Sequence, residues 1–385
     1  MNSPARGTRP ANRRELVLAA ASELFYRRGY SNVSMRDIAA AVAIGPSALY
    51  RHFRTKKDLL EAVVSDAMTS LQKALDTSRD NPTIDAIGAL TTAQHEGRAV
   101  GVLWHREARH LTDSAQQELR QRIRDVTGQI DAALRQRRPE LDQRQADFLA
   151  WAVLGVATSI SFHTVEVPAG LFTELVHAVA ETAIPPLHSG TFHPGGDGSN
   201  AWAPSRREAI LASTIGLFAA RGYADVSVED IGTAIGIAGP SVYNHFDTKA
   251  EILILAMERG HEILRADLHR ALGRATGPGD ALGRLVTSYS EFALENGNLI
   301  RLLNSETDQL PPEDRDRIRT IQHDYITEWT QLVRQAEPAR DDPEAHIRVH
   351  AALNMINDIA TTPHLSLLGN ANAAIEVLCA DVLRR

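Results

Sequence analysis

The sequence repeats itself, and this repeat constrains the fold more than any other feature. Several stretches of the first half return in the second half at one constant offset and without gaps. The first copies are Leu24–Tyr30, Val33–Ser34, Asp37–Ala39, Tyr50–Phe53 and Thr55–Lys56, and they return as Leu217–Tyr223, Val226–Ser227, Asp230–Gly232, Tyr243–Phe246 and Thr248–Lys249. Beyond Leu60 and Leu253 the copies no longer align by eye. This pattern predicts two equivalent heads, each followed by a divergent body.

The segment between the copies separates two halves of the chain. Pro185 and Pro186 precede a run from His193 to Asn200 that is rich in Gly, Asp and Ser, and such residues do not continue a helix. We therefore expect a flexible linker at 187–203. The remaining chain divides into a first head at 1–58, a first body at 59–186, a second head at 204–251 and a second body at 252–385.

Composition favours an all-α protein. The 385 residues suffice for two or three domains with cores that need no disulfide, and Cys379 is the one cysteine. Aromatic residues make up 5% of the chain and β-branched runs are short, which favours helices. No stretch of about 20 apolar residues and no signal-peptide pattern is found. We expect a cytoplasmic protein that does not enter a membrane.

Each copy has the spacing of three short helices. Apolar residues at helical spacing form one stripe in the first copy, at Val17, Ala21, Leu24 and Phe25, and in the second, at Ile210, Thr214, Leu217 and Phe218. Gly29 and Gly222 follow the stripe, where the end of a helix favours a positive φ. Ser34 and Ser227 are candidate N-caps of the second helix.

The second helix of the first copy is expected from about Met35 to Val42. The third begins near Pro46, a residue tolerated in a first turn, and a long helix begins at Lys56. A tight turn between the second and third helices is typical of a helix-turn-helix, whose third helix presents side chains to base edges in the major groove of DNA.

The residues after this turn carry a family resemblance. They are Ile44–Phe53, Lys56 and Leu59–Leu60 in the first copy, and Ile237–Phe246, Lys249 and Ile252–Leu253 in the second. Both sets resemble the signature of TetR-family transcriptional regulators. The resemblance implies a three-helix DNA-binding head on a helical-bundle body, and a repressor that leaves its double-stranded DNA operator when a small effector binds. Activation in place of repression stays open.

A closer resemblance concerns the tandem layout together with Leu103–Arg109 and Gly236–Pro240. These features resemble the double-TetR repressors of mycobacterial mammalian-cell-entry operons, which are lipid-related. The resemblance implies a hydrophobic effector, namely a lipid, a sterol-like molecule or an acyl-CoA, and no cofactor. Aromatic and histidine side chains of the bodies are candidates to line its pocket or simply to pack the core: Trp104, His105, Trp151, Tyr325 and Trp329, and further Phe148, His163, Tyr289, Phe292 and His350.

The resemblance also assigns DNA contacts to residues of the two heads. Tyr50 with Lys56, and Tyr243 with Lys249, would bind phosphates, which fixes register without reading sequence. Base readout would fall in the first head to Arg36, Pro46, Ser47, Ala48, Arg51 and His52, and in the second to Glu229, Gly239, Pro240, Ser241, Asn244 and His245. Each of these side chains is otherwise part of a solvated helix face. Phe53 and Phe246 are expected in the cores.

The two heads differ in charge. Residues 1–60 hold eleven basic and four acidic side chains, a net charge of +7, whereas residues 200–255 hold four and six, a net charge of −2. Because phosphate neutralisation supplies most non-specific affinity, the first head should bind DNA more strongly. Glu229 can accept a hydrogen bond from cytosine and so read sequence. A second head that no longer binds DNA, in a sensor that works as a homodimer, remains the alternative.

The resemblance places a four-helix dimer interface in the last two helices of each body. The candidates lie around 142–164 and 168–184 in the first half, and around 341–361 and 370–384 in the second. The covalent tether raises the effective concentration of the halves, so we expect an intramolecular pseudo-dimer that reads an asymmetric operator. A homodimer with four heads is the competing arrangement.

Other classes are disfavoured by missing motifs. We find no nucleophile elbow, no phosphate-binding loop and no zinc-protease or Cys-x-x-Cys motif, so an enzyme is not expected. His346 and His350 lie one helical turn apart, with Asn354 and Asp358 on the same stripe, but no third metal ligand is obvious. We therefore expect no metal site.

Overall fold

The computed structural model describes residues 13–80, 85–190 and 205–384, and these are almost entirely helical. The chain forms two compact units: residues 1–137 with 157–173, and residues 138–156 with 174–385. The helices of the first half are α1 (Arg13–Arg28), α2 (Met35–Ala41), α3 (Pro46–Tyr50), α4 (Lys56–Asp80), α5 (Ala86–Glu96), α6 (Val100–Val102), α7 (Asp113–Arg137), α8 (Gln143–Thr158) and α9 (Ala169–Glu181). Short 3₁₀ or π turns are η1 (Tyr30–Asn32), η2 (Leu103–Glu107), η3 (Ala108–His110) and η4 (Ser159–Phe162).

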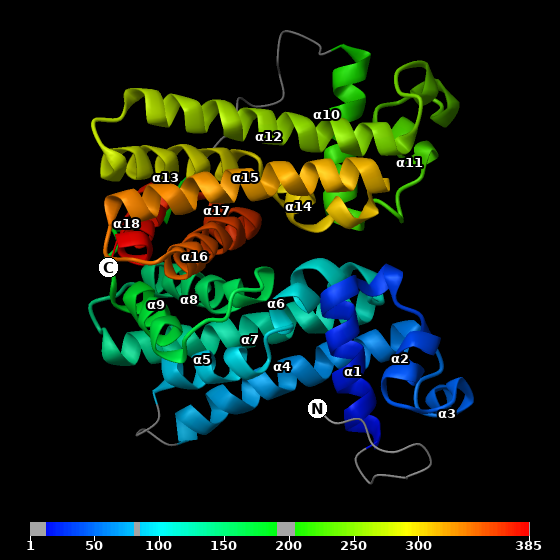
Figure 1. Cartoon of the computed structure of the whole chain (residues 1–385), viewed down its shortest axis with the longest axis horizontal. Coiled ribbons are helices and arrows are strands. Elements are labelled where there is room, and N and C mark those ends of the chain that lie inside the picture. The colour runs from blue at the N-terminus through cyan, green and yellow to red at the C-terminus, as the bar shows by residue number, and fades with distance from the viewer. Residues whose placement is uncertain (1–12, 81–84, 191–204, 385) are drawn as a thin grey trace. The chain divides into compact units, whose positions relative to one another are not determined.

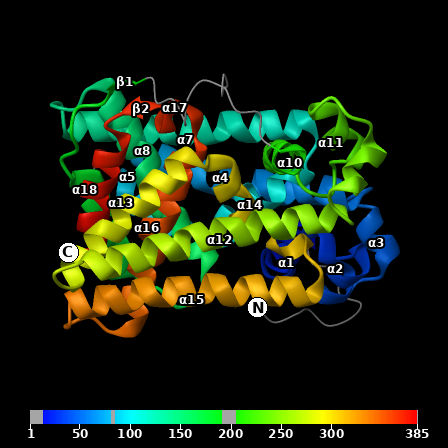
Figure 2. The ribbon, with the colours of Figure 1, turned by 90° about the horizontal axis from the view of Figure 1, so that it is seen from above.

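The second half repeats this order. Its helices are α10 (Arg206–Arg221), α11 (Val228–Ala234), α12 (Lys249–Arg274), α13 (Pro278–Glu295), α14 (Gly297–Ser305), α15 (Pro312–Ala336), α16 (Asp342–Thr361), α17 (Pro363–Ser366) and α18 (Ala371–Arg384), with 3₁₀ turns η5 (Gly239–Asn244) and η6 (Thr307–Gln309). The long helices α12 and α15 run alongside each other, as both views show (Figures 1 and 2). They form one side of the second body.

The local signals predicted from the repeat are confirmed. Ser34 caps α2 and Ser227 caps α11, each in a reciprocal capping box with the aspartate three residues later, Asp37 or Asp230. Bonding to Ser34 lowers the pKa of the Asp37 carboxyl. Gly29 and Gly222 have φ values of 78° and 82°, a region that favours glycine. These signals start and stop the same helices in both heads.

The cores of the heads also repeat. Phe25 and Phe218 are fully buried, and Phe53 and Phe246 are buried as predicted. The Arg14 guanidinium lies over the Phe53 ring at 5.5 Å, and the Arg207 guanidinium lies over Phe246 at 4.1 Å. Cation–π contact at equivalent positions ties the start of each first helix to the end of the helix-turn-helix.

The third element differs between the heads. In the first head it is the α-helix α3, but in the second it is the 3₁₀ helix η5. A Cβ on Gly232 would lie 2.8 Å from the backbone nitrogen of Gly239, so glycine lets η5 approach α11 more closely than a side chain would allow. The proline has also moved, because Pro240 corresponds to Ser47 and not to Pro46. The third elements of the two heads therefore share a core but differ in helical period.

The first residues of the predicted linker, 187–190, have a defined structure. Leu187 is buried, and β1 (His188–Ser189) pairs with β2 (Leu368–Gly369) in a short antiparallel ladder. Asn370 adds a hydrogen bond to the carbonyl of Pro186 at 2.9 Å. Residues 187–190 are thus attached to the second body, while the remainder of the predicted linker, from 191, lies outside the described residues.

Helices from both sides of the linker meet inside the second unit. The Arg348 side chain of α16 is 2% exposed, pairs with Glu344 (2.8 Å) and with Glu174 of α9 (3.0 Å), and donates to the Val382 carbonyl in α18 (2.9 Å). Asn354 of α16 donates to the Gly155 carbonyl in α8 at 2.7 Å. These four helices match the predicted interface segments within a few residues.

One helical stretch, Gln143–Phe162, is long and apolar enough by length and composition to cross a membrane. The sequence-based expectation that no such stretch exists was therefore too strict. In the described part of the chain, 78% of its most apolar window is buried against other residues. This burial is typical of a core helix, and α8 contacts α16 inside the second unit.

Candidate nucleic-acid interface

Most residues predicted to read bases in the first head lie on its surface. Arg36 in α2, Pro46 and Ser47 in α3, and Arg51 and His52 just after it are exposed, and Ala48 is half-buried. Tyr50 is 51% exposed, which is unusual for so large an apolar ring. Leu49, between them, is fully buried and anchors α3 to the core. The arrangement presents guanidinium, imidazole, hydroxyl and methyl groups together.

The second head presents an equivalent surface with different chemistry. Glu229, Pro240 and Asn244 are exposed, Tyr243 is 53% exposed, and Ser241 and His245 are half-buried. The exception is Gly239, which is buried because it packs against Glu229: a Cβ there would lie 3.0 Å from the Glu229 Cα. Its nomination as a reading residue is corrected to a packing role. Where the first head has Arg36 and Arg51, the second has a carboxylate and an amide.

The signature lysines are engaged inside the heads. Lys56 Nζ donates to the carbonyls of Tyr30 (2.8 Å) and Val33 (2.9 Å) and lies 4.1 Å from the Tyr30 ring centre. Lys249 Nζ repeats these contacts with Tyr223 and Val226. Burial lowers the pKa of both lysines. A phosphate contact by either lysine stays a prediction, and the geometry gives each a structural role in holding the head to its long helix.

Two buried glutamates were missed by the sequence reasoning. Glu107 accepts a hydrogen bond from the backbone nitrogen of Tyr30 at 3.1 Å, and Glu306 accepts one from that of Tyr223 at 3.4 Å. Both side chains are 2% exposed. The sequence carries no clear signal for them, because each glutamate has mostly polar or charged neighbours and lies where the two copies no longer align.

The aromatic residues proposed to line an effector pocket fall into separate groups. In the first body the ring centres of Trp104 and His105 lie 5.1 Å apart with the rings tilted, and His105 also contacts Phe162 edge-on. The Trp151 ring centre lies 5.8 Å from that of His364, a residue of the second half, so Trp151 takes part in the contact between halves. Its role in an effector pocket stays a prediction. Three of the remaining candidates, Phe148, His163 and Phe292, are buried in the protein interior.

A second aromatic group lies inside the second body. Tyr289, Tyr325 and Trp329 form a triangle with ring centres 5.8 to 6.4 Å apart. Tyr289 donates to Asn357 at 2.8 Å. The Tyr325 hydroxyl and the Trp329 indole nitrogen are buried and make no hydrogen bond within the described residues. Such groups are costly unless they find a partner.

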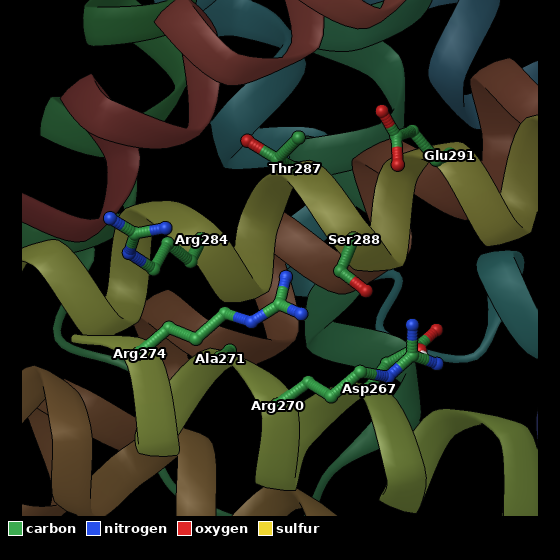
Figure 3. Close-up of a pocket in the computed structure, with 8 residues that line it drawn as sticks. All are labelled: Asp267, Arg270, Ala271, Arg274, Arg284, Thr287, Ser288 and Glu291. Atoms are coloured by element: carbon green, nitrogen blue, oxygen red, sulfur yellow. Dashed lines mark hydrogen bonds and ion pairs between the residues drawn. The ribbon is translucent and has the colours of Figure 1, made fainter.

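One surface pocket of the second body has a different chemistry. It has a volume of about 320 Å³, lies between α12 and α13, and is lined by Asp267, Arg270, Ala271, Arg274, Arg284, Thr287, Ser288 and Glu291 (Figure 3). Arg270 pairs with Asp267, and Arg284 pairs with Asp280. This charged lining does not match the hydrophobic effector expected from the resemblance, and its two carboxylates offset two of its three guanidinium groups.

His346 and His350 lie with ring centres 4.6 Å apart on α16. Burial lowers the pKa of the His346 imidazole. Within the described residues, no group of three or more His, Cys, Asp or Glu side chains is placed to hold a metal ion. The histidine pair thus sits on the polar stripe predicted from the sequence, with Asn354 bonded across to α8.

Comparison with known protein families matches both heads. Residues 17–63 and 210–256 each match the profile described as bacterial regulatory proteins of the tetR family. Residues 275–361 match the profile of a tetracyclin repressor-like C-terminal domain. The matched segments cover both helix-turn-helix regions and most of the second body.

Curated relatives include one repressor and one activator from Mycolicibacterium smegmatis. The chain is 31% identical over 122 residues to the HTH-type transcriptional repressor KstR2. This alignment covers 30% of this chain and 58% of KstR2. It is 38% identical over 88 residues to the HTH-type transcriptional activator FasR. This alignment covers 20% of this chain and 40% of FasR. The matches therefore span about half the length of these relatives, and both relatives are regulators and not enzymes.

Among solved structures, a TetR-family transcriptional regulator from Bordetella parapertussis is 20% identical, with a TM-score of 0.43. The comparison covers 47% of this chain and 96% of that one.

Proposed function

We propose that this chain is a TetR-family regulator that carries the family's N-terminal domain twice. On this premise, it represses transcription by binding one asymmetric operator with both heads. The observation that carries the proposal is a pair of exposed reading faces on a shared scaffold. Tyr50 and Tyr243 occupy equivalent exposed positions, while Arg36 in one head corresponds to Glu229 in the other.

Support for a pseudo-dimer comes from the contacts inside the second unit. Helices α8 and α9 of the first half contact α16 and α18 of the second through Gly155, Glu174 and Arg348. Burial raises the pKa of the Asp358 carboxyl at this contact to about 8, which favours its uncharged form. We propose that this surface does within one chain what a dimer interface does between two chains, with the heads and bodies divided near residues 58, 186, 204 and 251.

The effector is proposed to bind the second body at the aromatic triangle. Tyr325 and Trp329 offer two buried donors among apolar rings, so a matching ligand would be largely apolar and would carry a hydrogen-bond acceptor. A lipid, a sterol-like molecule or an acyl-CoA has this chemistry. The resemblance to regulators of mammalian-cell-entry operons adds the expectation that the regulated genes handle lipids. As a TetR-type regulator it would work in the cytoplasm.

Footprinting on the DNA upstream of the chain's own gene tests the proposal. Arg36→Ala should weaken protection of one half-site by about tenfold or more, because a bidentate arginine–guanine contact contributes about 1–3 kcal/mol. Glu229→Ala should relax base preference in the other half-site, with a smaller loss of affinity because it removes a like charge from near the phosphates.

The same experiment can contradict the proposal. A perfect inverted repeat with equal half-site affinities would exclude an asymmetric reader. Unchanged footprints in both variants would show that the assigned reading faces are wrong. Protection of one half-site alone, unaffected by Glu229→Ala, would favour a second head that does not bind DNA.

A further inference from the structure

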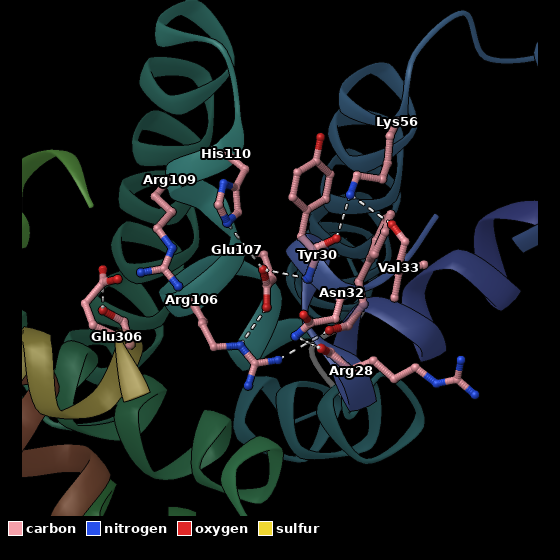
Figure 4. A network of polar contacts seen from close by, with 12 residues as sticks. Arg28, Tyr30, Asn32, Val33, Lys56, Arg106, Glu107, Arg109, His110 and Glu306 are labelled. Atoms are coloured by element: carbon pink, nitrogen blue, oxygen red, sulfur yellow. Dashed lines mark hydrogen bonds and ion pairs between the residues drawn. The ribbon is translucent and has the colours of Figure 1, made fainter. Parts of the chain in front are cut away.

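In each half, a glutamate of the body accepts a hydrogen bond from one backbone amide of the head. In the first unit Glu107, at the end of the π-helical turn η2, accepts the hydrogen bond of the Tyr30 backbone nitrogen at 3.1 Å (Figure 4). Tyr30 directly follows Gly29, whose positive φ ends α1 and turns the chain toward α2. A change in the position of Glu107 would therefore act at the bend between the first and second head helices.

Arg106 reinforces this contact. Its Nε donates to Glu107 Oε1 at 2.6 Å, and its terminal nitrogen donates to the carbonyls of Phe25 (3.3 Å) and Tyr26 (3.0 Å). These carbonyls belong to the last turn of α1, where the helix dipole favours a cation. His110 stacks on the Tyr30 ring with centres 4.7 Å apart. The π-helical turn thus holds the end of α1 from the body side.

The peptide groups flanking Tyr30 are held from two directions. Its nitrogen is bonded to Glu107 of the body, while its carbonyl accepts from Lys56 of α4 at 2.8 Å. Because α4 is the long helix that joins head to body, a shift of η2 against α4 would turn the peptide at Tyr30 and with it the start of α2. Hydrogen bonds to charged groups contribute more to stability than neutral ones, so the bonds to Glu107 and Lys56 hold this peptide firmly.

The second unit repeats the arrangement. Glu306 accepts the Tyr223 backbone nitrogen, Lys249 donates to the Tyr223 carbonyl, and Gly222 precedes it with a φ of 82°. The repetition is informative because Glu107 and Glu306 lie beyond the region in which the two copies align. The contact therefore recurs between bodies whose sequences have otherwise diverged.

We infer that Glu107 and Glu306 are positioning residues, each of which sets the angle of its own head on its own body. The inference rests on the proposed function, because head orientation matters only if the heads read DNA. It assigns control of the first half-site to the first body and of the second half-site to the second body. The residues before the two glutamates differ. Arg106 Nε donates to Glu107 at 2.6 Å, whereas the Ser305 hydroxyl donates to the Arg301 carbonyl at 2.8 Å and to Glu306 Oε1 at 3.4 Å.

The test compares Glu107→Ala, Glu107→Gln and Glu306→Ala in the full chain. Hydrogen exchange without DNA should show faster exchange of the Tyr30 amide by about tenfold or more in Glu107→Ala, and of the Tyr223 amide in Glu306→Ala. Footprints should weaken at the half-site of the altered head while the other half-site is unchanged. Glu107→Gln keeps an acceptor oxygen, so it should restore most of the protection and of the footprint.

Two results would overturn the inference. One is unchanged exchange at Tyr30 in Glu107→Ala, which would mean that the carboxylate does not hold the head. The other is equal weakening of both half-sites by either alanine variant, which is the signature of general destabilisation. The exchange measurement needs no DNA, so it judges the contact even if the wild-type chain gives no footprint, a result that would count against the proposed function instead.

Discussion

Replacing Gly155 by leucine should separate the two halves of the chain. A Cβ at position 155 would lie 3.0 Å from the Met355 Cα and 3.2 Å from the Asp358 Oδ2 atom, so the backbone would have to move to admit even one carbon. Leucine adds three more carbons to this contact between α8 and α16. We expect a loss of about 3 kcal/mol in the free energy of unfolding, at the upper end of the cost of overpacking.

A cut chain makes this effect measurable. With a protease site inserted between residues 191 and 200, the wild-type fragments should stay together after cleavage and sediment as one particle. The Gly155→Leu fragments should sediment separately. Gly128→Leu is the matched control, because Gly128 is an exposed position of α7 with open space around its Cβ, and leucine there should be neutral or slightly stabilising. Gly155→Leu fragments that remain associated would show that α8 and α16 do not hold the halves.

Converting the charge of the second head should have the largest effect on DNA binding. Glu229→Arg, Asn244→Arg and Asp247→Arg together give the second head the basic residues of the first, and change its formal charge from −2 to +3. All three positions are exposed. Affinity for a duplex that carries two copies of the first half-site should rise by about tenfold or more, and the salt dependence should steepen by about 0.9 for each added phosphate contact.

A control is needed that changes the net charge of the chain by the same amount away from the second head. Asp324→Arg, Glu328→Arg and Gln331→Arg on the exposed face of α15 make the same change in formal charge without touching a head. This control should bind all duplexes slightly better and leave base preference unaltered. If both triple variants behave alike, the reading face assigned to the second head is wrong and only net charge matters.

The heads could be predicted from sequence because their signals are local. Capping serines, the glycines after the first helix and the apolar stripe each act within a few residues, so the repeat displayed them twice. The 3₁₀ form of η5 could not be predicted, because it depends on how closely Gly239 packs on α11. Its burial also explains why a surface role for Gly239 was wrong.

The contacts of the bodies could not be predicted because they are not local in sequence. Glu107 meets Tyr30, and Trp151 meets His364, across long separations in sequence, so no periodicity reveals either contact. Trp151 resembled a pocket residue in the sequence, and it lies where the halves meet. The candidate interface helices came from the family resemblance, and helices do form at these segments and contact one another inside the second unit. Their role as an interface that replaces a dimer stays a proposal.

The mass of the complex between the chain and its operator tests the central claim most directly. If the halves of one chain supply both heads, native mass measurement should find one chain per operator duplex, at every protein concentration that saturates the DNA. Two chains per duplex, appearing together with cooperative binding, would show that four heads are needed and that the pseudo-dimer is not the unit that reads DNA.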